Sequence, residues 1–253
     1  FIPSSVEIIG KNAFYLCNRL CSIQFSPNSK IQSIGERSFS KTLLREISIP
    51  ASVVQIDDKC FYDCKDLEVV EFAVDSKLTT IGQFAFYGTS IESIKIPQNV
   101  EELKDGWASG ASKLVEISVP KNNKRYFDVD GKILIEKVDD FSILKWASNR
   151  FEKVTVPSFI TKIGPYAFYK GQTAKLIEFS DDSKIQSIGK FAFSSSSIEL
   201  IKFPACLTQI EENAFDYCEN LKYVDFSENS ELCSIGRFTF SSSSIEIIKI
   251  PSK

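Results

Sequence analysis

The sequence predicts an α/β repeat protein, a solenoid in which each repeat adds one strand to a parallel sheet. Two observations support this fold class. An apolar residue followed by Pro recurs along the chain, and four of the six intervals between these prolines are 47 residues long. Each 47-residue interval is divided by a Phe, which leaves alternating units of 23 and 24 residues. A period of this size is typical of supersecondary units that stack and bury a continuous core. The markers are Pro3, Pro50, Pro97, Pro120, Pro157, Pro204 and Pro251, with Phe25, Phe72, Phe179 and Phe226 between them.

The end of each unit predicts the strand. Its last six or so residues follow the pattern apolar-x-x-apolar-x-apolar, as in Leu44-Ile47-Ile49. Because side chains alternate across a strand, the fourth and sixth positions face the core, and the third and fifth face outward. This spacing is typical of leucine-rich repeats, whose period is about 20 to 29 residues. We therefore expect a right-handed, curved leucine-rich-repeat solenoid of about ten repeats, with one parallel sheet on its concave side.

The residues in the middle of each unit are expected to form the convex side of the solenoid. A Phe recurs at one repeat position, and Trp107 takes its place in the fifth unit, so we expect a buried aromatic ladder on short helical or irregular turns. A Gly follows an Ile in six units, where a tight turn would need a permissive backbone. The Phe residues are Phe14, Phe39, Phe61, Phe86, Phe168, Phe193, Phe215 and Phe240, and the Gly residues are Gly10, Gly35, Gly82, Gly164, Gly189 and Gly236.

The sixth unit departs from the pattern. It spans 37 residues, and residues 120–155 form an atypical repeat with an insertion. Asp130-Gly131 between apolar runs is a strong hairpin signal, and Asp139-Asp140 indicates a second turn. The insertion is either a structural spacer or a projection that presents Tyr126, Phe127 and Trp146 to a ligand. Residues 1–253 are predicted to form a single domain, and the absence of Met indicates a fragment of a longer array.

Composition argues against several classes of function. The chain has no His, which removes the usual general base and most zinc sites. Its net charge of -3 argues against a nucleic-acid partner, and no apolar run is long enough for a membrane span. Asp128-x-Asp130-Gly131 lacks the remaining carboxylates of a calcium loop and is better explained by the turn. We therefore expect no catalytic residues, no metal and no cofactor. Of the functions considered, an enzymatic activity is the remote alternative.

The seven cysteines predict thiols rather than a disulfide framework. Cys17, Cys64 and Cys218 share one repeat position, and repeats two apart are separated by roughly 10 Å, beyond disulfide reach. We expect this column to consist of buried free thiols. Cys206 and Cys233 lie in adjacent units at nearby positions and are the one pair to consider for a disulfide.

Three segments carry a resemblance to a known family. They read IPSSVEIIGKNAFYLCNRLCSI (residues 2–23), FSDDSKIQSIG (179–189) and FSSSSIELIKFP (193–204). They resemble BspA-like leucine-rich repeats, a class known from surface proteins of host-associated bacteria and parasitic protists. The resemblance implies a cell-surface or extracellular location and a binding or adhesion function. The implied partner is a protein or glycoprotein at a cell surface or in the extracellular matrix. An intracellular or structural interaction scaffold is the alternative, and uncapped repeat ends allow self-association.

The predicted strand register identifies a candidate binding surface near the carboxyl end. Four consecutive third positions are apolar, whereas most earlier ones are polar, and an exposed apolar stripe often marks an interaction site. The alternative is that this stripe packs against another subunit or is covered by the neighbouring charged side chains. The apolar column is Leu176, Leu200, Tyr223 and Ile247, and the charged fifth-position column beside it is Glu178, Lys202, Asp225 and Lys249.

Overall fold

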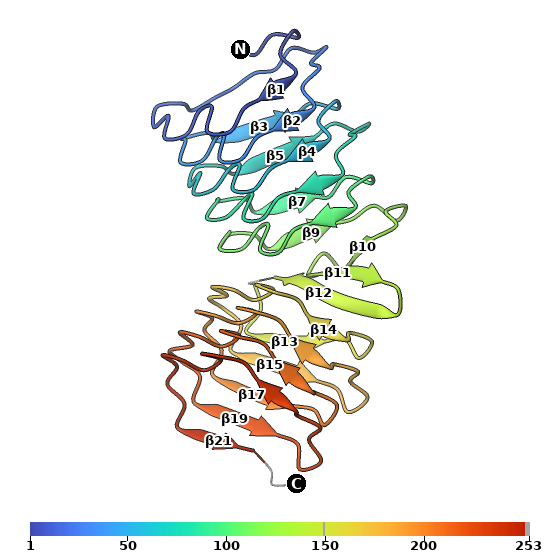
Figure 1. The fold of residues 1–253 in the computed structure, drawn as a ribbon, viewed down its shortest axis with the longest axis vertical. Helices are drawn as coiled ribbons and strands as arrows, with labels where there is room; N and C mark the ends of the chain where they lie inside the picture. Colours follow the sequence, from blue (N-terminus) through green and yellow to red (C-terminus); the bar gives the residue numbers. More distant parts are fainter. Residues whose placement is uncertain (149, 251–253) are drawn as a thin grey trace. The chain divides into compact units, whose positions relative to one another are not determined.

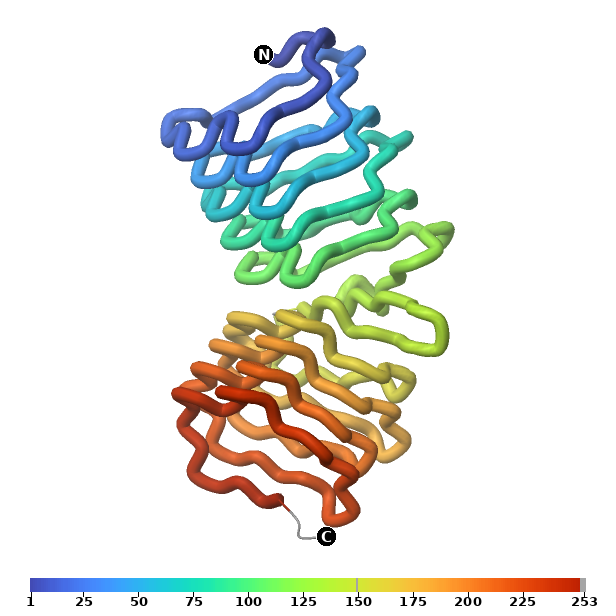
Figure 2. The backbone as a smooth tube through the Cα atoms, in the orientation of Figure 1, coloured from blue at the N-terminus to red at the C-terminus, as the bar shows by residue number. Residues whose placement is uncertain are grey.

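The computed structural model describes residues 1–148 and 150–250 and consists of stacked β-repeats in two compact units (Figure 1). Unit 1 spans Phe1–Lys132 and unit 2 spans Ile133–Lys253, so the boundary lies inside the atypical repeat. The single domain over residues 1–253 stays a prediction, and Pro251, the last marker of the period, lies outside the described residues. Figure 2 shows how successive coils of the chain follow one another in sequence order within unit 1.

The strands fall into three groups. The long strands end the repeats: β3 (Glu46–Ile49), β5 (Val69–Phe72), β7 (Ser93–Lys95), β9 (Glu116–Ser118), β13 (Lys153–Val156), β15 (Leu176–Phe179), β17 (Leu200–Phe203), β19 (Tyr223–Phe226) and β21 (Ile247–Lys249). The short strands have two residues each: β1 (Ile8–Ile9), β2 (Ser33–Ile34), β4 (Gln55–Ile56), β6 (Thr80–Ile81), β8 (Glu102–Leu103), β14 (Lys162–Ile163), β16 (Ser187–Ile188), β18 (Gln209–Ile210) and β20 (Ser234–Ile235). The insertion contains β10 (Tyr126–Val129), β11 (Ile133–Val138) and β12 (Phe141–Ala147).

The long strands confirm the predicted inward and outward positions. β3 and β5 are parallel, with Ile47 opposite Val70 and Ser48 opposite Glu71. In β3 the two Ile side chains are buried and the intervening side chains are exposed, which is the alternation that a one-sided sheet requires. The first predicted strand, at residues 20–25, is reduced to an isolated bridge between Ile2 and Phe25. Repeats of 23 and 24 residues with parallel sheets are thus confirmed, whereas their handedness and curvature stay predictions.

A second parallel ladder runs through the short strands, and it corrects the expectation of one strand per repeat. In unit 1 it has the order β1-β2-β4-β6-β8, and in unit 2 the order β12-β14-β16-β18-β20, with β11 added antiparallel to β12. Its inward residue is an Ile or Leu in every repeat, and Ile34, Ile56 and Ile188 have no exposed surface. Each repeat therefore adds an inward side chain to two opposed ladders, which together enclose the core.

Turns, and not helices, connect the two ladders, so the α/β class is wrong for the described ranges 1–148 and 150–250. Alternate N–H groups of each turn bond within the turn, as from Ala13 to the carbonyl oxygen of Gly10 at 3.2 Å. The others bond to the next repeat, as from Phe14 to the carbonyl oxygen of Ser38 at 2.7 Å. In a helix the N–H groups beyond the first turn bond within the helix, whereas in these turns every second N–H group bonds to the next repeat.

The aromatic ladder is confirmed. Phe39, Phe61, Phe86, Phe193 and Phe215 are among the largest fully buried side chains. Consecutive rings stack with centroids 5.1 to 5.5 Å apart from Phe14 to Phe86. Trp107 continues the ladder as predicted, edge-on to Phe86 at 6.2 Å.

The recurrent Gly has a different role from the predicted one. Its φ is negative or extended in the column, so the turn itself does not require Gly. A Cβ built on Gly35 would instead lie 2.8 Å from the carbonyl oxygen of Ile9, and one on Gly189 would lie 2.8 Å from the nitrogen of Pro165. The backbone of the preceding repeat thus occupies the space of the side chain. Positive φ occurs two residues later, at non-glycine residues such as Arg37 and Phe191.

The insertion is built into the fold rather than projected from it. Both predicted turns are confirmed: Asp130 and Gly131 have φ of 52° and 67°, and Val138 lies opposite Phe141 across the second turn. β12 pairs in parallel with β14, so the insertion starts the short-strand ladder of unit 2. The Tyr126 and Trp146 side chains are 2% and 6% exposed, and Phe127 is half-buried. The structural interpretation therefore holds for Tyr126 and Trp146, and their presentation to a ligand is wrong.

The cysteines are all free thiols, so the considered disulfide between Cys206 and Cys233 does not form. The Cys206 thiol donates to the carbonyl oxygen of Ser183 at 3.1 Å, whereas the Cys233 thiol donates to that of Glu231 at 3.2 Å. Because the two residues occupy unequal repeat positions, their side chains turn toward different carbonyls. Cys64 and Cys218 are buried as predicted, but Cys17 is exposed.

Candidate binding surface on the long strands

The predicted apolar column is continuous in unit 2. Leu176, Leu200, Tyr223 and Ile247 lie directly opposite one another on β15, β17, β19 and β21. Tyr223 and Ile247 are 41% and 46% exposed, and the two Leu side chains are half-buried. The inward residues between them, such as Ile201 and Val224, are buried, which forces this column onto the outer face of the sheet. The structure thus brings the four apolar residues together, and their binding role stays a prediction.

The charged column lies beside the apolar one and does not cover it with a chain of ion pairs. Lys202 is opposite Asp225, and Asp225 is opposite Lys249. No ion pair joins these three side chains, all of which belong to the described part of the chain. Glu178 pairs with Lys153 on the preceding strand β13, at 2.8 Å between Nζ and Oε1. The surface is therefore an apolar stripe flanked by one paired carboxylate, Glu178, and by three charged side chains that form no ion pair among the described residues.

A depression opens within this surface where β15 and β17 separate. The two strands are paired only at Leu176–Leu200 and Ile177–Ile201, and the register stops before Glu178 and Phe179. The space that results has a volume of about 330 Å³, and we call it the unit 2 hollow. Its lining consists of Leu176, Ile177, Glu178, Phe179, Leu200 and Lys202. Four of these six residues belong to the predicted surface.

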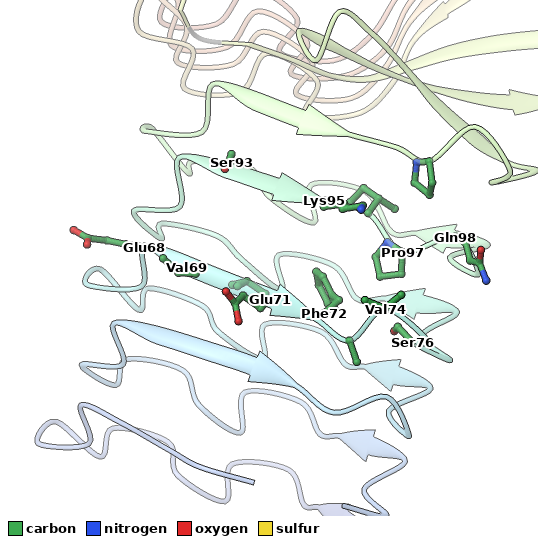
Figure 3. Close-up of a pocket in the computed structure, with 14 residues that line it drawn as sticks. Glu68, Val69, Glu71, Phe72, Val74, Ser76, Ser93, Lys95, Pro97 and Gln98 are labelled. Carbon is green, nitrogen blue, oxygen red and sulfur yellow. The ribbon is translucent and has the colours of Figure 1, made fainter. Parts of the chain in front are cut away.

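A larger depression in unit 1 was not predicted from the sequence. This unit 1 hollow has a volume of about 630 Å³ and lies between β5 and β7. Figure 3 shows Phe72, Val74 and Pro97 gathered at one end of it, while Glu68 extends away from them at the other. Val74 is fully exposed, at 102%. One sequence signal was available, because Val74 stands where the other long units have the polar or turn residues Pro27, Asp181 and Glu228.

The unit 1 hollow exists because the long-strand ladder is interrupted between β5 and β7. The N–H of Glu68 bonds to the carbonyl oxygen of Arg45 at 2.9 Å, and that of Val115 bonds to Glu92 at 2.9 Å. Within the part of the chain that the structure describes, the corresponding bond from Glu92 to Glu68 is missing. Just before the two strands, the N–H of Ser90 bonds to the carbonyl oxygen of Leu67 at 3.0 Å, the one such bond at this step among the described residues. The strands therefore diverge toward Phe72 and Pro97.

The remaining candidates for chemistry have structural roles. Asp128, part of the weak calcium pattern, accepts the N–H of Val119 at 2.8 Å and that of Gly131 at 2.9 Å, so its carboxylate holds the turn.

Within residues 1–148 and 150–250, no three His, Cys, Asp or Glu side chains are grouped as metal ligands would be. The same residues contain no helix with the length and apolar character of a membrane span.

Comparison with known proteins agrees with the fold. A family model described as the BspA type leucine-rich repeat region matches residues 1–115 and 145–253 in six copies. No curated protein sequence matches the chain. The crystal structure of the pneumococcal vaccine antigen PcpA is 22% identical with a TM-score of 0.76, and the match covers 97% of this chain and 68% of that one.

A second similar structure is a leucine-rich cell surface protein from Faecalibacterium prausnitzii. It is 22% identical with a TM-score of 0.68, over 98% of this chain and 79% of that one. At this level of identity the two structures support the fold alone. The family model covers far more than half of the chain and leaves out most of the insertion. The chain therefore belongs to the BspA-type leucine-rich repeat family.

Proposed function

We propose that the chain is a non-catalytic binding module, exposed at a cell surface, that recognises a protein or glycoprotein partner and contributes to adhesion. The observation that carries this proposal is the continuous apolar column Leu176, Leu200, Tyr223 and Ile247 on the open face of the unit 2 sheet. An exposed apolar stripe with a Tyr among aliphatic neighbours is typical of interface centres. The location is supported by the similar structures, whose names describe a vaccine antigen and a cell surface protein.

The sequence lacks the residues that usually catalyse reactions, which supports a binding function over an enzymatic one. The chain has no His, and the thiols of Cys60, Cys64 and Cys218 are buried. Burial raises the pKa of the Cys218 thiol to about 11, so it is protonated and a poor nucleophile at neutral pH. The family to which the chain belongs is likewise known for surface proteins rather than enzymes.

The test begins with a partner found by screening this chain against extracellular-matrix proteins and whole cells, beside a repeat-shuffled chain. The double variant Tyr223→Asp and Leu200→Glu should then lose at least about tenfold in affinity, because truncating a residue at the centre of an interface costs about 2 kcal/mol or more. The matched control is Ser22→Asp with Gln24→Glu, which adds the same two charges to exposed positions outside the column.

The control should bind as the unmodified chain does. Circular dichroism and sedimentation should show an unchanged fold and oligomeric state in both variants. Full affinity of the Tyr223 and Leu200 double variant for a verified partner would place the contact elsewhere. Self-association that the double variant abolishes would show that the column is an interface between copies of the chain.

A further inference from the structure

A basic turn begins the atypical repeat. Lys121, Lys124 and Arg125 lie close together in the turn that leads from β9 to β10, and all three side chains are exposed (Figure 1). The turn lies outside residues 1–115 and 145–253, which the family model matches. The corresponding turns have no Lys or Arg in the four residues that follow the marker prolines Pro3, Pro50, Pro97, Pro157 and Pro204. The positive charges therefore belong to the insertion and not to the repeat pattern.

The side chain of Asn123 holds this turn in place. Its Oδ1 accepts the N–H of Arg125 at 2.9 Å and that of Tyr126 at 2.8 Å. Its Nδ2 donates to the carbonyl oxygens of Pro97 at 3.2 Å and Val100 at 3.1 Å, in the turn of the preceding repeat. Because these bonds fix the backbone between the basic residues, less conformational entropy is lost when the turn binds a ligand.

A small polar depression lies between this turn and the preceding one, and we call it the basic hollow. Its volume is about 260 Å³. The amide of Asn122 donates to Oε1 of Gln98 at 2.6 Å, which joins the two turns. Side-chain amides and charged groups form most of the lining, and Val100 is its apolar member. The lining consists of Gln98, Asn99, Val100, Glu101, Asn122, Lys124 and Arg125.

Cations outnumber anions at the basic hollow. Its lining carries Lys124 and Arg125 against Glu101, and Lys121 adds a third cation to the same turn. Lys121, Lys124 and Glu101 form no ion pair among the described residues, so the carboxylate does not neutralise the two ammonium groups. Asp128, which follows in the chain, uses both carboxylate oxygens on backbone N–H groups. The hollow therefore has a local excess of positive charge on a chain whose net charge is -3.

We propose that the basic hollow binds a sulfated polysaccharide. A sulfate group contacts Lys124 and Arg125, the sugar hydroxyls bond to the amides of the lining, and Lys121 contacts a neighbouring sulfate. Charge-assisted hydrogen bonds to such oxygens are stronger than neutral ones, and the planar fork of Arg matches two oxygens at once. The site lies in unit 1 and shares no residue with the apolar column of unit 2. It rests on the proposed exposure at a cell surface and adds a second ligand to the proposed function.

The lining favours a sulfated sugar over an acidic peptide or a nucleic acid. A peptide interface usually has aromatic or aliphatic anchors at its centre, whereas the amides of Gln98, Asn99 and Asn122 offer the donors and acceptors that hydroxyl groups need. Single-stranded nucleic acids are bound through aromatic rings on which the bases stack, and the lining of the basic hollow contains no ring.

The experiment titrates the full chain with a heparin hexasaccharide, followed by calorimetry at several salt concentrations. The second probe is the fully desulfated hexasaccharide, which keeps the carboxylates and hydroxyls, and it should bind at least about tenfold more weakly. The double variant Lys121→Gln with Lys124→Gln should also bind the sulfated probe at least about tenfold more weakly. The slope of log affinity against log salt concentration should fall in magnitude by about two, one for each cation removed.

Lys41→Gln with Lys65→Gln is the matched control. Both lysines are exposed, form no ion pair among the described residues and lie in turns that precede long strands, whereas the basic hollow lies in turns that follow them. This variant should keep the affinity and the salt slope of the unmodified chain. The Tyr223→Asp and Leu200→Glu double variant should also bind the hexasaccharide fully, so failure of the proposed partner surface and failure of this site are distinguishable.

Four outcomes would overturn the proposal. They are no saturable binding of the sulfated probe at about 1 mM, equal affinity for the desulfated probe, an unchanged affinity after Lys121→Gln with Lys124→Gln, and an equal loss in the matched control. A polyglutamate peptide of the same charge serves as a third probe. If it binds as tightly as the hexasaccharide, the hollow recognises negative charge alone and the assignment to a sulfated sugar is wrong.

Discussion

At the scale of single residues, contacts between repeats decide which side chain is acceptable. Gly35 is required because the carbonyl oxygen of Ile9 lies 2.8 Å from where its Cβ would be, and not because of its own dihedral angles. The sequence shows that Gly recurs but not why, since a turn with positive φ and a close approach of backbone favour the same residue. The positive φ falls instead on residues such as Arg37 and Phe191, which no propensity scale would select.

Gly35→Ala should therefore lower the free energy of unfolding by about 1–3 kcal/mol, as overpacking against backbone does. Gly10→Ala is the matched variant, because no atom lies within 4 Å of the Cβ at the same repeat position. It should change stability by no more than about 1 kcal/mol, with a gain favoured by the lower entropy of the unfolded chain. Chemical denaturation measures both, and equal losses in the two variants would show that the close approach is not what selects Gly.

At the scale of elements, periodicity determines what the sequence can predict. The long strands were predictable because apolar residues alternate over several positions, as in Ile47 and Ile49. The short strands were not, because two residues carry no period and only their Ile or Leu marks them. The hollow between β5 and β7 was not predicted either, because it opens where the two strands are unpaired and, apart from Val74, the residues there resemble those at paired steps. On the unit 2 surface, the strand register predicted the apolar column from Leu176 to Ile247, whereas the unit 2 hollow was not predicted.

The Phe ladder gives the element-scale prediction. Phe193 is 1% exposed and stacks on Phe168 and Phe215 at 4.7 and 4.8 Å, so Phe193→Ala should cost about 3–5 kcal/mol of stability. Ser195→Ala, two residues along the same turn, should stay within about 0.5 kcal/mol, because no hydrogen bond of its hydroxyl group is made within the described chain. Thermal melts compare the two, and similar shifts would mean that the ladder does not hold the turns.

At the scale of the whole molecule, stability comes from repetition, with many equivalent contacts and no disulfide among the seven cysteines. Each repeat stacks on its neighbours through two strand ladders, the turns and the aromatic column. Such arrays are stabilised by the interfaces between repeats rather than by any repeat alone. The free energy of unfolding also depends on pH through the buried thiols. These thiols are protonated in the folded chain and can ionise when the chain unfolds.

Stability should consequently fall at alkaline pH. Desolvation raises the pKa of Cys218 to about 11 and raises the pKa values of Cys60 and Cys64 as well. An unfolded thiol ionises near about pH 8.5, so above that pH the unfolded state binds fewer protons and gains stability. Each such thiol should lower the free energy of unfolding by about 1.4 kcal/mol per pH unit, for Cys218 until about pH 11.

Urea denaturation under reducing conditions at about pH 8 and about pH 10 measures this slope. The variant Cys218→Ala should reduce the slope by the contribution of one thiol, whereas Cys233→Ala, at an exposed position, should leave it unchanged. A stability that does not vary over this range would contradict the burial of the thiols.

The stacking of the turns has an electrostatic consequence. In both units the turn N–H groups that cross between repeats all point toward later repeats, as from Phe14 to Ser38 and from Phe193 to Ala214. Three such peptide groups recur every repeat in the turns around Phe14, Phe39 and Phe61. With about 4.8 Å between repeats this is one aligned dipole per about 1.6 Å, close to the 1.5 Å of an α-helix. Bonds outside the turns point the other way and are about as numerous, as from Gly35 to Ile9 and from Glu68 to Arg45. Each column of turns is thus a local array of aligned dipoles with its positive end toward later repeats, and the strand side of the same repeats carries dipoles of the opposite direction.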